Sequence, residues 1–120
     1  MNIIVVHNNQ NILEIIKTAL NDAGYDNVVL SLNVNDAFSK MKETDFDLVM
    51  ANYNMEYISG LYFLKMIRGD DKFKTIKFIM MFIELNRDLF MGSIEAGADA
   101  FVHKPYDSER LKKIIDSIFA

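Results

Sequence analysis

The chain has 120 residues, of which 51% are hydrophobic and 25% charged, and its formal net charge is −4 at neutral pH. This length is enough to bury one core, so we expect a single domain over residues 1–120, and the negative charge with scattered basic residues argues against a nucleic-acid partner. The lack of cysteine excludes disulfides and thiolate metal sites, and no apolar run suits a membrane span or a secretory signal, so we expect a cytoplasmic protein without a membrane partner.

Apolar segments alternate with amphipathic segments along the chain. Residues 3–6 predict a buried strand, and apolar residues then recur at helical spacing from Ile12 to Leu20, before Gly24. The same pattern predicts further strands at 28–30, 46–51, 78–82 and 100–102, and further helices at 35–42, about 61–67, 89–96 and 107–119. Five βα units predict an α/β fold with a doubly wound, five-stranded parallel sheet between two layers of helices.

Sites in such sheets form beyond the carboxyl ends of the strands, where the strand order reverses. The candidate site residues are therefore those that follow the predicted strands: His7, Asn8, Asn52, Phe82 and Lys104.

Two separated motifs carry a family resemblance. The first runs from Asn52 to Leu61, with the letters NYNMEYISGL, and the second from Ala96 to Asp107, with the letters AGADAFVHKPYD. At this spacing they resemble the receiver domain of bacterial response regulators over nearly the whole chain. The resemblance implies the flavodoxin-like (βα)5 fold of the chemotaxis regulators and a role in two-component or phosphorelay-type signalling.

The resemblance also implies a five-part phosphorylation pocket, of which four parts have changed in this chain. The family uses two acidic residues and an acceptor aspartate to hold Mg²⁺, and here His7, Asn8 and Asn52 stand at those positions. Magnesium prefers anionic oxygen ligands, so we expect weak or no Mg²⁺ binding, no other metal and no cofactor. An amide also cannot replace a carboxylate as the nucleophile that attacks phosphorus.

At the remaining family positions, the residue that would respond to a phosphoryl group has been replaced. Phe82 replaces the hydroxyl residue that binds a phosphoryl oxygen, and it cannot form that hydrogen bond. Phe101 stands where the family has an aromatic switch residue, and we predict that its rotamer is fixed here. Lys104 is retained, and Pro105 implies a structural turn whose peptide bond is typically cis in this family.

A run of large apolar residues predicts a surface for a partner. Leu89, Phe90 and Met91 are consecutive in a predicted helix, so at least one of them should be exposed. In the resembled family, the face of the fourth helix, fifth strand and fifth helix docks partners or a second copy of the domain, and these three residues with Phe101 map to it.

We therefore predict an atypical receiver, not an enzyme, that acts in a signalling pathway through phosphorylation-independent contact with a protein, either a different chain or a second copy. One alternative is a conventional phosphorelay regulator that is phosphorylated at an unusual acceptor. Another is a small-ligand sensor that uses the crevice at the strand ends, although the chain has no Gly-rich phosphate loop or catalytic triad pattern. A third is a normal receiver inactivated by mutation, which would require four concurrent changes.

Overall fold

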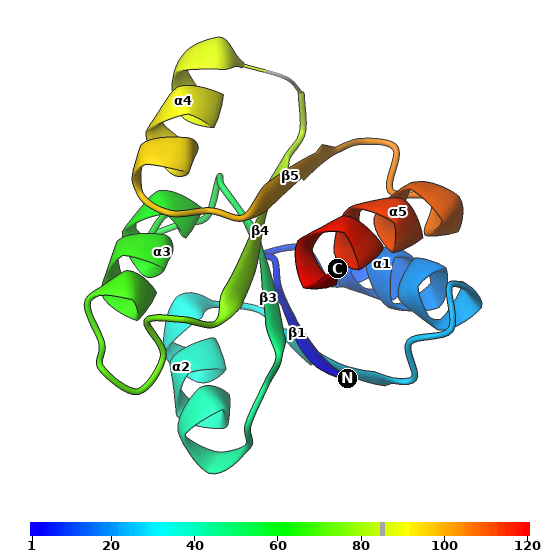
Figure 1. The fold of residues 1–120 in the computed structure, drawn as a ribbon, viewed down its shortest axis with the longest axis horizontal. Coiled ribbons are helices and arrows are strands. Elements are labelled where there is room, and N and C mark those ends of the chain that lie inside the picture. The colour runs from blue at the N-terminus through cyan, green and yellow to red at the C-terminus, as the bar shows by residue number, and fades with distance from the viewer. Residues whose placement is uncertain (85) are drawn as a thin grey trace.

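The computed structural model describes residues 1–84 and 86–120. Five strands and five helices alternate along these residues (Figure 1). In chain order they are β1 (Asn2–Val6), α1 (Gln10–Asp22), β2 (Asn27–Ser31), α2 (Val34–Glu43), β3 (Leu48–Asn52), α3 (Gly60–Arg68), β4 (Lys77–Phe82), α4 (Arg87–Glu95), β5 (Ala100–His103) and α5 (Ser108–Phe119). The predicted alternation is confirmed.

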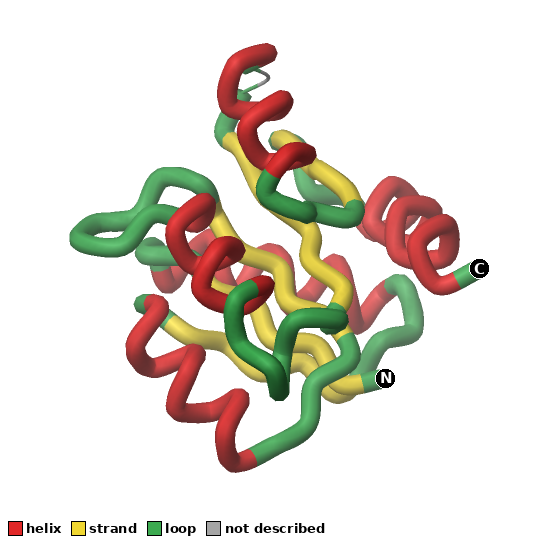
Figure 2. Tube along the Cα trace, turned by 60° about the vertical axis from the view of Figure 1, so that its left-hand side comes forward, coloured by secondary structure: helices red, strands yellow, loops and turns green. Residues whose placement is uncertain are grey.

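All five strands are parallel and lie in the order β2-β1-β3-β4-β5. Helices α1 and α5 cover one face of the sheet, and α2, α3 and α4 cover the other (Figure 1). Figure 2 shows the twisted sheet between these two groups of helices. This is the doubly wound, flavodoxin-like arrangement, whose strand order reverses between β1 and β3.

Alternation along the strands divides the core into two halves. Ile3 and Val5 pack under α1 and α5, whereas Ile4 and Val6 pack under α2 and α3, because successive side chains of a strand point to opposite faces. All four side chains are fully buried. This double burial explains why β1 reads as a continuous apolar run rather than as an alternating one.

Each helix begins at a residue whose side-chain oxygen accepts a hydrogen bond from a backbone N–H of the first turn. Such N-caps each stabilise a helix by about 1 kcal/mol. The capping residues are Asn9, Asn33, Ser59, Asn86 and Asp107. None of the helices within residues 1–84 and 86–120 combines the length and apolar character needed to cross a bilayer.

The third strand begins two residues later than the sequence pattern predicts, and it includes Asn52. Asp47 lies outside the strand because its backbone and side chain bond to the start of β1: the Asn2 N–H donates to the Asp47 carboxylate at 2.7 Å, and the Asp47 N–H donates to the Asn2 carbonyl at 2.8 Å. Asn52 is therefore the last residue of β3 and pairs in register with Met81 of β4.

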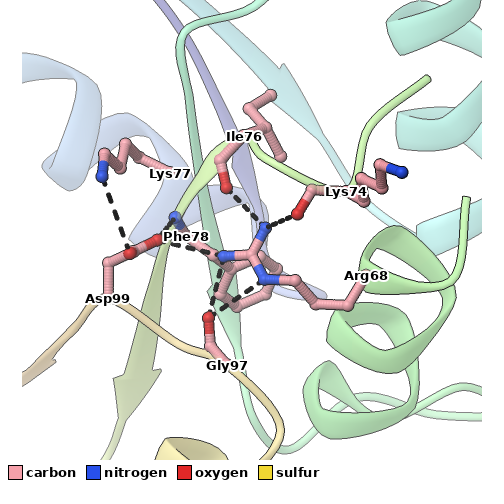
Figure 3. Close-up of polar contacts among 7 residues, drawn as sticks. All are labelled: Arg68, Lys74, Ile76, Lys77, Phe78, Gly97 and Asp99. Carbon is pink, nitrogen blue, oxygen red and sulfur yellow. Dashed lines mark hydrogen bonds and ion pairs between the residues drawn. The ribbon is translucent and has the colours of Figure 1, made fainter. Parts of the chain in front are cut away.

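Arg68, the last residue of α3, joins three segments at the side of the sheet that α3 and α4 cover (Figure 3). Its guanidinium donates to the Gly97 carbonyl at 2.8 and 3.1 Å, to the Lys74 carbonyl at 3.1 Å and to the Ile76 carbonyl at 2.6 Å. It also pairs with the Asp99 carboxylate at 3.0 Å. Arg68 thus holds the turn after α4 against the loop that leads into β4.

Candidate functional site

The carboxyl edge of the sheet brings the predicted site residues together. The strand register places Val6 beside Ala51 and Phe82 beside His103, so the residues that follow β1, β3, β4 and β5 meet at this edge. His7, Asn52 and Phe82 are almost fully buried, whereas Asn8 and Lys104 are exposed. The site therefore has a buried floor and a polar rim.

Asn52 is fixed by two hydrogen bonds from its amide nitrogen. This nitrogen donates to the Asn54 carbonyl at 2.7 Å and to the Asn8 side-chain oxygen at 3.3 Å. The Asn52 side-chain oxygen is buried and has no hydrogen-bond partner within residues 1–84 and 86–120. The nitrogen thus ties the ends of β1 and β3 together, while the oxygen carries no charge with which to attack phosphorus or attract a cation.

His7 is buried with only one of its ring nitrogens engaged. Its Nδ1 accepts a hydrogen bond from the Asn9 N–H at 3.1 Å, so in the neutral ring the proton resides on Nε2. That Nε2 finds no partner among the described residues. Burial lowers the pKa of His7 below its ordinary value of 6.5, and the nearby Lys104 ammonium lowers it further.

These donors do not fit the divalent metal that receiver sites use. A magnesium ion takes several oxygen ligands, with carboxylates supplying the charge. Here the His7 Nε2 carries a proton, and the Asn8 oxygen already accepts from Asn52. Within the described part of the chain, no group of three or more His, Cys, Asp or Glu side chains is arranged to hold a metal ion.

Phe82 lies in a row of four aromatic rings. Its ring stacks on Tyr53, which follows β3, at 5.5 Å between centroids, and on Phe101 of β5 at 6.1 Å. Phe90 of α4 then contacts Phe101 at 4.1 Å. This row, which we call the aromatic stack (Tyr53, Phe82, Phe101 and Phe90), extends from the loop after β3 to α4.

Lys104 and Pro105 form the turn after β5. The Lys104–Pro105 peptide bond is cis, as the resemblance implied. Lys104 is exposed, and the amides of Asn8 and Asn52 bond to each other. Tyr106, the next residue, donates from its hydroxyl to the Phe82 carbonyl at 3.1 Å and so fixes the turn against the end of β4.

Gly60 shapes the site, although no sequence pattern predicted this role. Gly60 begins α3, and its N–H donates to the Tyr53 carbonyl at 2.9 Å. A Cβ at this position would overlap the carbonyl oxygen of Asn52 and would lie 2.9 Å from the Met80 sulfur. Only glycine therefore lets α3 pack this closely against the end of β3, and the signal in the sequence was the glycine itself, directly after the Ser59 cap.

The predicted partner surface is partly exposed. Leu89 and Phe90 are half-buried, whereas Met91 is 45% exposed, which confirms that at least one member of the run faces solvent. On the same helix Ile94 is 44% exposed, and Ile83, which follows β4, is 51% exposed. A separate hollow of about 210 Å³ opens beside Asn8, on the other side of the site.

Comparison with known proteins agrees with this geometry. The sequence matches the family described as response regulator receiver domain over residues 3–116. It is 30% identical over 119 residues to the chemotaxis protein CheY-3 of Vibrio cholerae serotype O1, covering 99% of this chain and 92% of that protein. It is 29% identical to the chemotaxis protein CheY of Pseudomonas aeruginosa, covering 99% and 96%. The solved structure of the chemotaxis response regulator CheY4 of Vibrio cholerae superimposes with a TM-score of 0.87 at 24% identity, covering 98% of this chain and 97% of that one.

Proposed function

The chain belongs to the response regulator receiver domain family, and we propose that it works in a cytoplasmic signalling pathway as an atypical receiver, through protein contacts that do not depend on phosphate at residue 52. It is a non-enzymatic module in this proposal. Its partner is a protein that docks on the face formed by α4, β5 and α5.

The aromatic stack is the observation that carries this proposal. In a conventional receiver a hydroxyl residue at the end of the fourth strand binds the phosphoryl group, and movement of an aromatic residue on the fifth strand follows. Here Phe82 and Phe101 are stacked ring against ring, and Phe82 is only 3% exposed. The stack supports one rotamer of Phe101, because another rotamer would lose its contacts with the rings of both Phe82 and Phe90.

The polar part of the pocket supports the same proposal. Phosphoryl transfer depends on a positioned nucleophile and on positive charge around the transferring oxygens. Asn52 supplies an amide whose nitrogen is already engaged twice, and His7 presents an N–H rather than an anionic oxygen. Three requirements of the transfer step, namely the nucleophile, the metal and the hydroxyl, thus fail together.

The proposed partner surface lies on α4, where the aromatic stack ends at Phe90. Phe90 anchors α4 to Phe101 at 4.1 Å, and this contact leaves Met91 and Ile94 exposed on the same helix. Ile83, in the loop between β4 and α4, is exposed as well. An exposed apolar patch is a feature of protein-binding surfaces when its side chains are contiguous. If the contact between Phe90 and Phe101 keeps α4 in one position, the helix presents this surface without any activating modification.

The first test is phosphate uptake. The purified chain is incubated with Mg²⁺ and acetyl phosphate beside a conventional receiver, and the intact mass of both is measured. We expect an adduct on the control and none on this chain. A stoichiometric, Mg²⁺-dependent adduct would overturn the proposal in favour of a regulator with an unusual acceptor, which peptide mapping would identify.

The second test asks whether the docked partner is another copy of the chain. Sedimentation velocity is compared for the wild type and for Met91→Glu, with Lys65→Glu, an exposed position on α3, as the control. A dimer that only Met91→Glu dissociates assigns a second copy to this face. A monomer in all three samples excludes a second copy as the partner on this face.

A further inference from the structure

His7 joins the end of β1 to the first turn of α1. Its backbone N–H donates to the Ser31 carbonyl of β2 at 3.1 Å, and its Nδ1 accepts from the Asn9 N–H at 3.1 Å. Asn9 in turn caps α1, because its side-chain oxygen accepts from the Ile12 N–H at 3.1 Å. One buried ring therefore sets the position of the capping residue.

We propose that His7 is an acid-sensitive latch, whose uptake of one proton releases the loop between β1 and α1 together with the first turn of α1. The proton comes from solvent and bonds to the Nδ1 lone pair. The nitrogen that accepted from Asn9 then becomes a donor that faces another donor, so the hydrogen bond at 3.1 Å is lost. The ring gains one positive charge, and no covalent bond breaks.

The surroundings of the ring provide no compensation for that charge. Lys104, from the turn after β5, is the charged side chain whose field acts on His7, and it repels a proton. The two residues that bond to His7, Ser31 through its carbonyl and Asn9 through its N–H, are both uncharged. A protonated ring that is only 3% exposed and lies near an ammonium must therefore move toward water.

The direction of the pH effect follows from the two states of the ring. In the closed state the pKa of His7 lies below 6.5, whereas in the open, solvated loop it returns to about that value. The open form therefore binds more protons, so acid favours it. The latch is fully closed above pH 6.5 and loosens as the pH falls from 6.5 toward the pKa of the closed state.

Opening would change the carboxyl edge of the sheet. Asn8, between the latch and the cap, accepts the hydrogen bond from Asn52 and lines the hollow of about 210 Å³. Release of the loop would withdraw Asn8 from both. The pH of the surroundings would thereby alter this edge of the domain, and this effect does not depend on whether the domain accepts phosphate.

Amide hydrogen exchange followed by NMR between pH 7.5 and 5.5 tests the latch, after correction for intrinsic exchange rates. Three chains are compared: the wild type, His7→Asn and His103→Asn. In His7→Asn the side-chain oxygen of the introduced amide can accept from the Asn9 N–H in place of Nδ1, but this amide does not titrate. The control, His103→Asn, removes the other histidine of the chain.

For the wild type and His103→Asn, we expect the opening constants of the Asn9 and Ile12 amides to rise up to tenfold per pH unit below pH 6.5. For His7→Asn we expect no such rise. Equal acid sensitivity in His7→Asn, or protection in the wild type that does not change with pH, would overturn the proposal.

The ring nitrogens of wild-type His7 give a second readout that needs no variant. Their ¹⁵N shifts should show Nδ1 unprotonated at pH 7.5 and protonated in step with the loss of protection at Asn9. A ring that titrates while Asn9 stays protected would refute the latch, even if His7→Asn did not fold.

Discussion

Replacing Arg68 with alanine should destabilise the domain by about 3 kcal/mol. Arg68 makes four hydrogen bonds to three carbonyl groups and an ion pair with Asp99, from a side chain that is 21% exposed (Figure 3). It connects α3 to the loop that leads into β4 and to the turn after α4, so no neighbouring side chain can take over all of these contacts.

The magnitude follows from the groups that lose a partner. A hydrogen bond to a charged group contributes about 1.5–3 kcal/mol net, and a buried acceptor left unpaired costs about 1–3 kcal/mol. Water reaches part of this cluster because Asp99 is 28% exposed, so the five contacts do not add. About 3 kcal/mol is a large share of the 5–15 kcal/mol that stabilises a domain of this size.

Urea unfolding measures this loss directly. With an m-value of about 2 kcal/mol per M, a loss of about 3 kcal/mol moves the midpoint by about 1.5 M. Lys65→Ala, which removes an exposed cation from the same helix, should change stability by less than about 0.5 kcal/mol.

Arg68→Lys separates geometry from charge. A lysine ammonium keeps the charge, but it cannot bond at the same time to the loop before β4 and to the turn after α4, as the planar guanidinium does. Most of the loss of stability should therefore remain. A loss below about 1 kcal/mol for Arg68→Ala, or full stability in Arg68→Lys, would refute the view that this fork holds the two turns together.

Three further changes probe the site. Asn52→Asp alone should give little or no adduct with acetyl phosphate in an intact-mass measurement, because the other three departures remain; robust labelling would contradict our account of the pocket. Gly60→Ala should cost at least about 2 kcal/mol in urea unfolding because its Cβ overlaps a backbone oxygen, whereas Gly92→Ala, with open space around it, should be neutral or stabilising. Phe82→Ala should destabilise the domain by about 3–5 kcal/mol and should broaden or split the Phe101 ring signals in NMR. Unchanged Phe101 signals would show that Phe82 does not fix the Phe101 rotamer.

The sequence by itself determined the order of the elements, and it predicted where a site would lie. Apolar runs such as residues 3–6 are buried on both faces wherever they pair, so they predict a parallel sheet without knowledge of the pairing. The site residues follow directly after strands, and parallel strands end at the same edge. Asn52, His7 and Phe82 could therefore be assigned to one edge of the sheet, and the chemistry that Asn52 cannot perform follows from its functional group alone.

Only the tertiary structure decided which groups meet. Arg68 contacts Gly97 across 29 positions of the chain, and the aromatic stack joins Tyr53 to Phe90 through two other strands. No local pattern encodes such contacts, because they depend on strand order and on the depth at which each helix packs. The same reason applies to His7: its residue type was visible in the sequence, but its single engaged nitrogen and its burial beside Lys104 arise only when β1 and β5 end at one edge of the folded sheet.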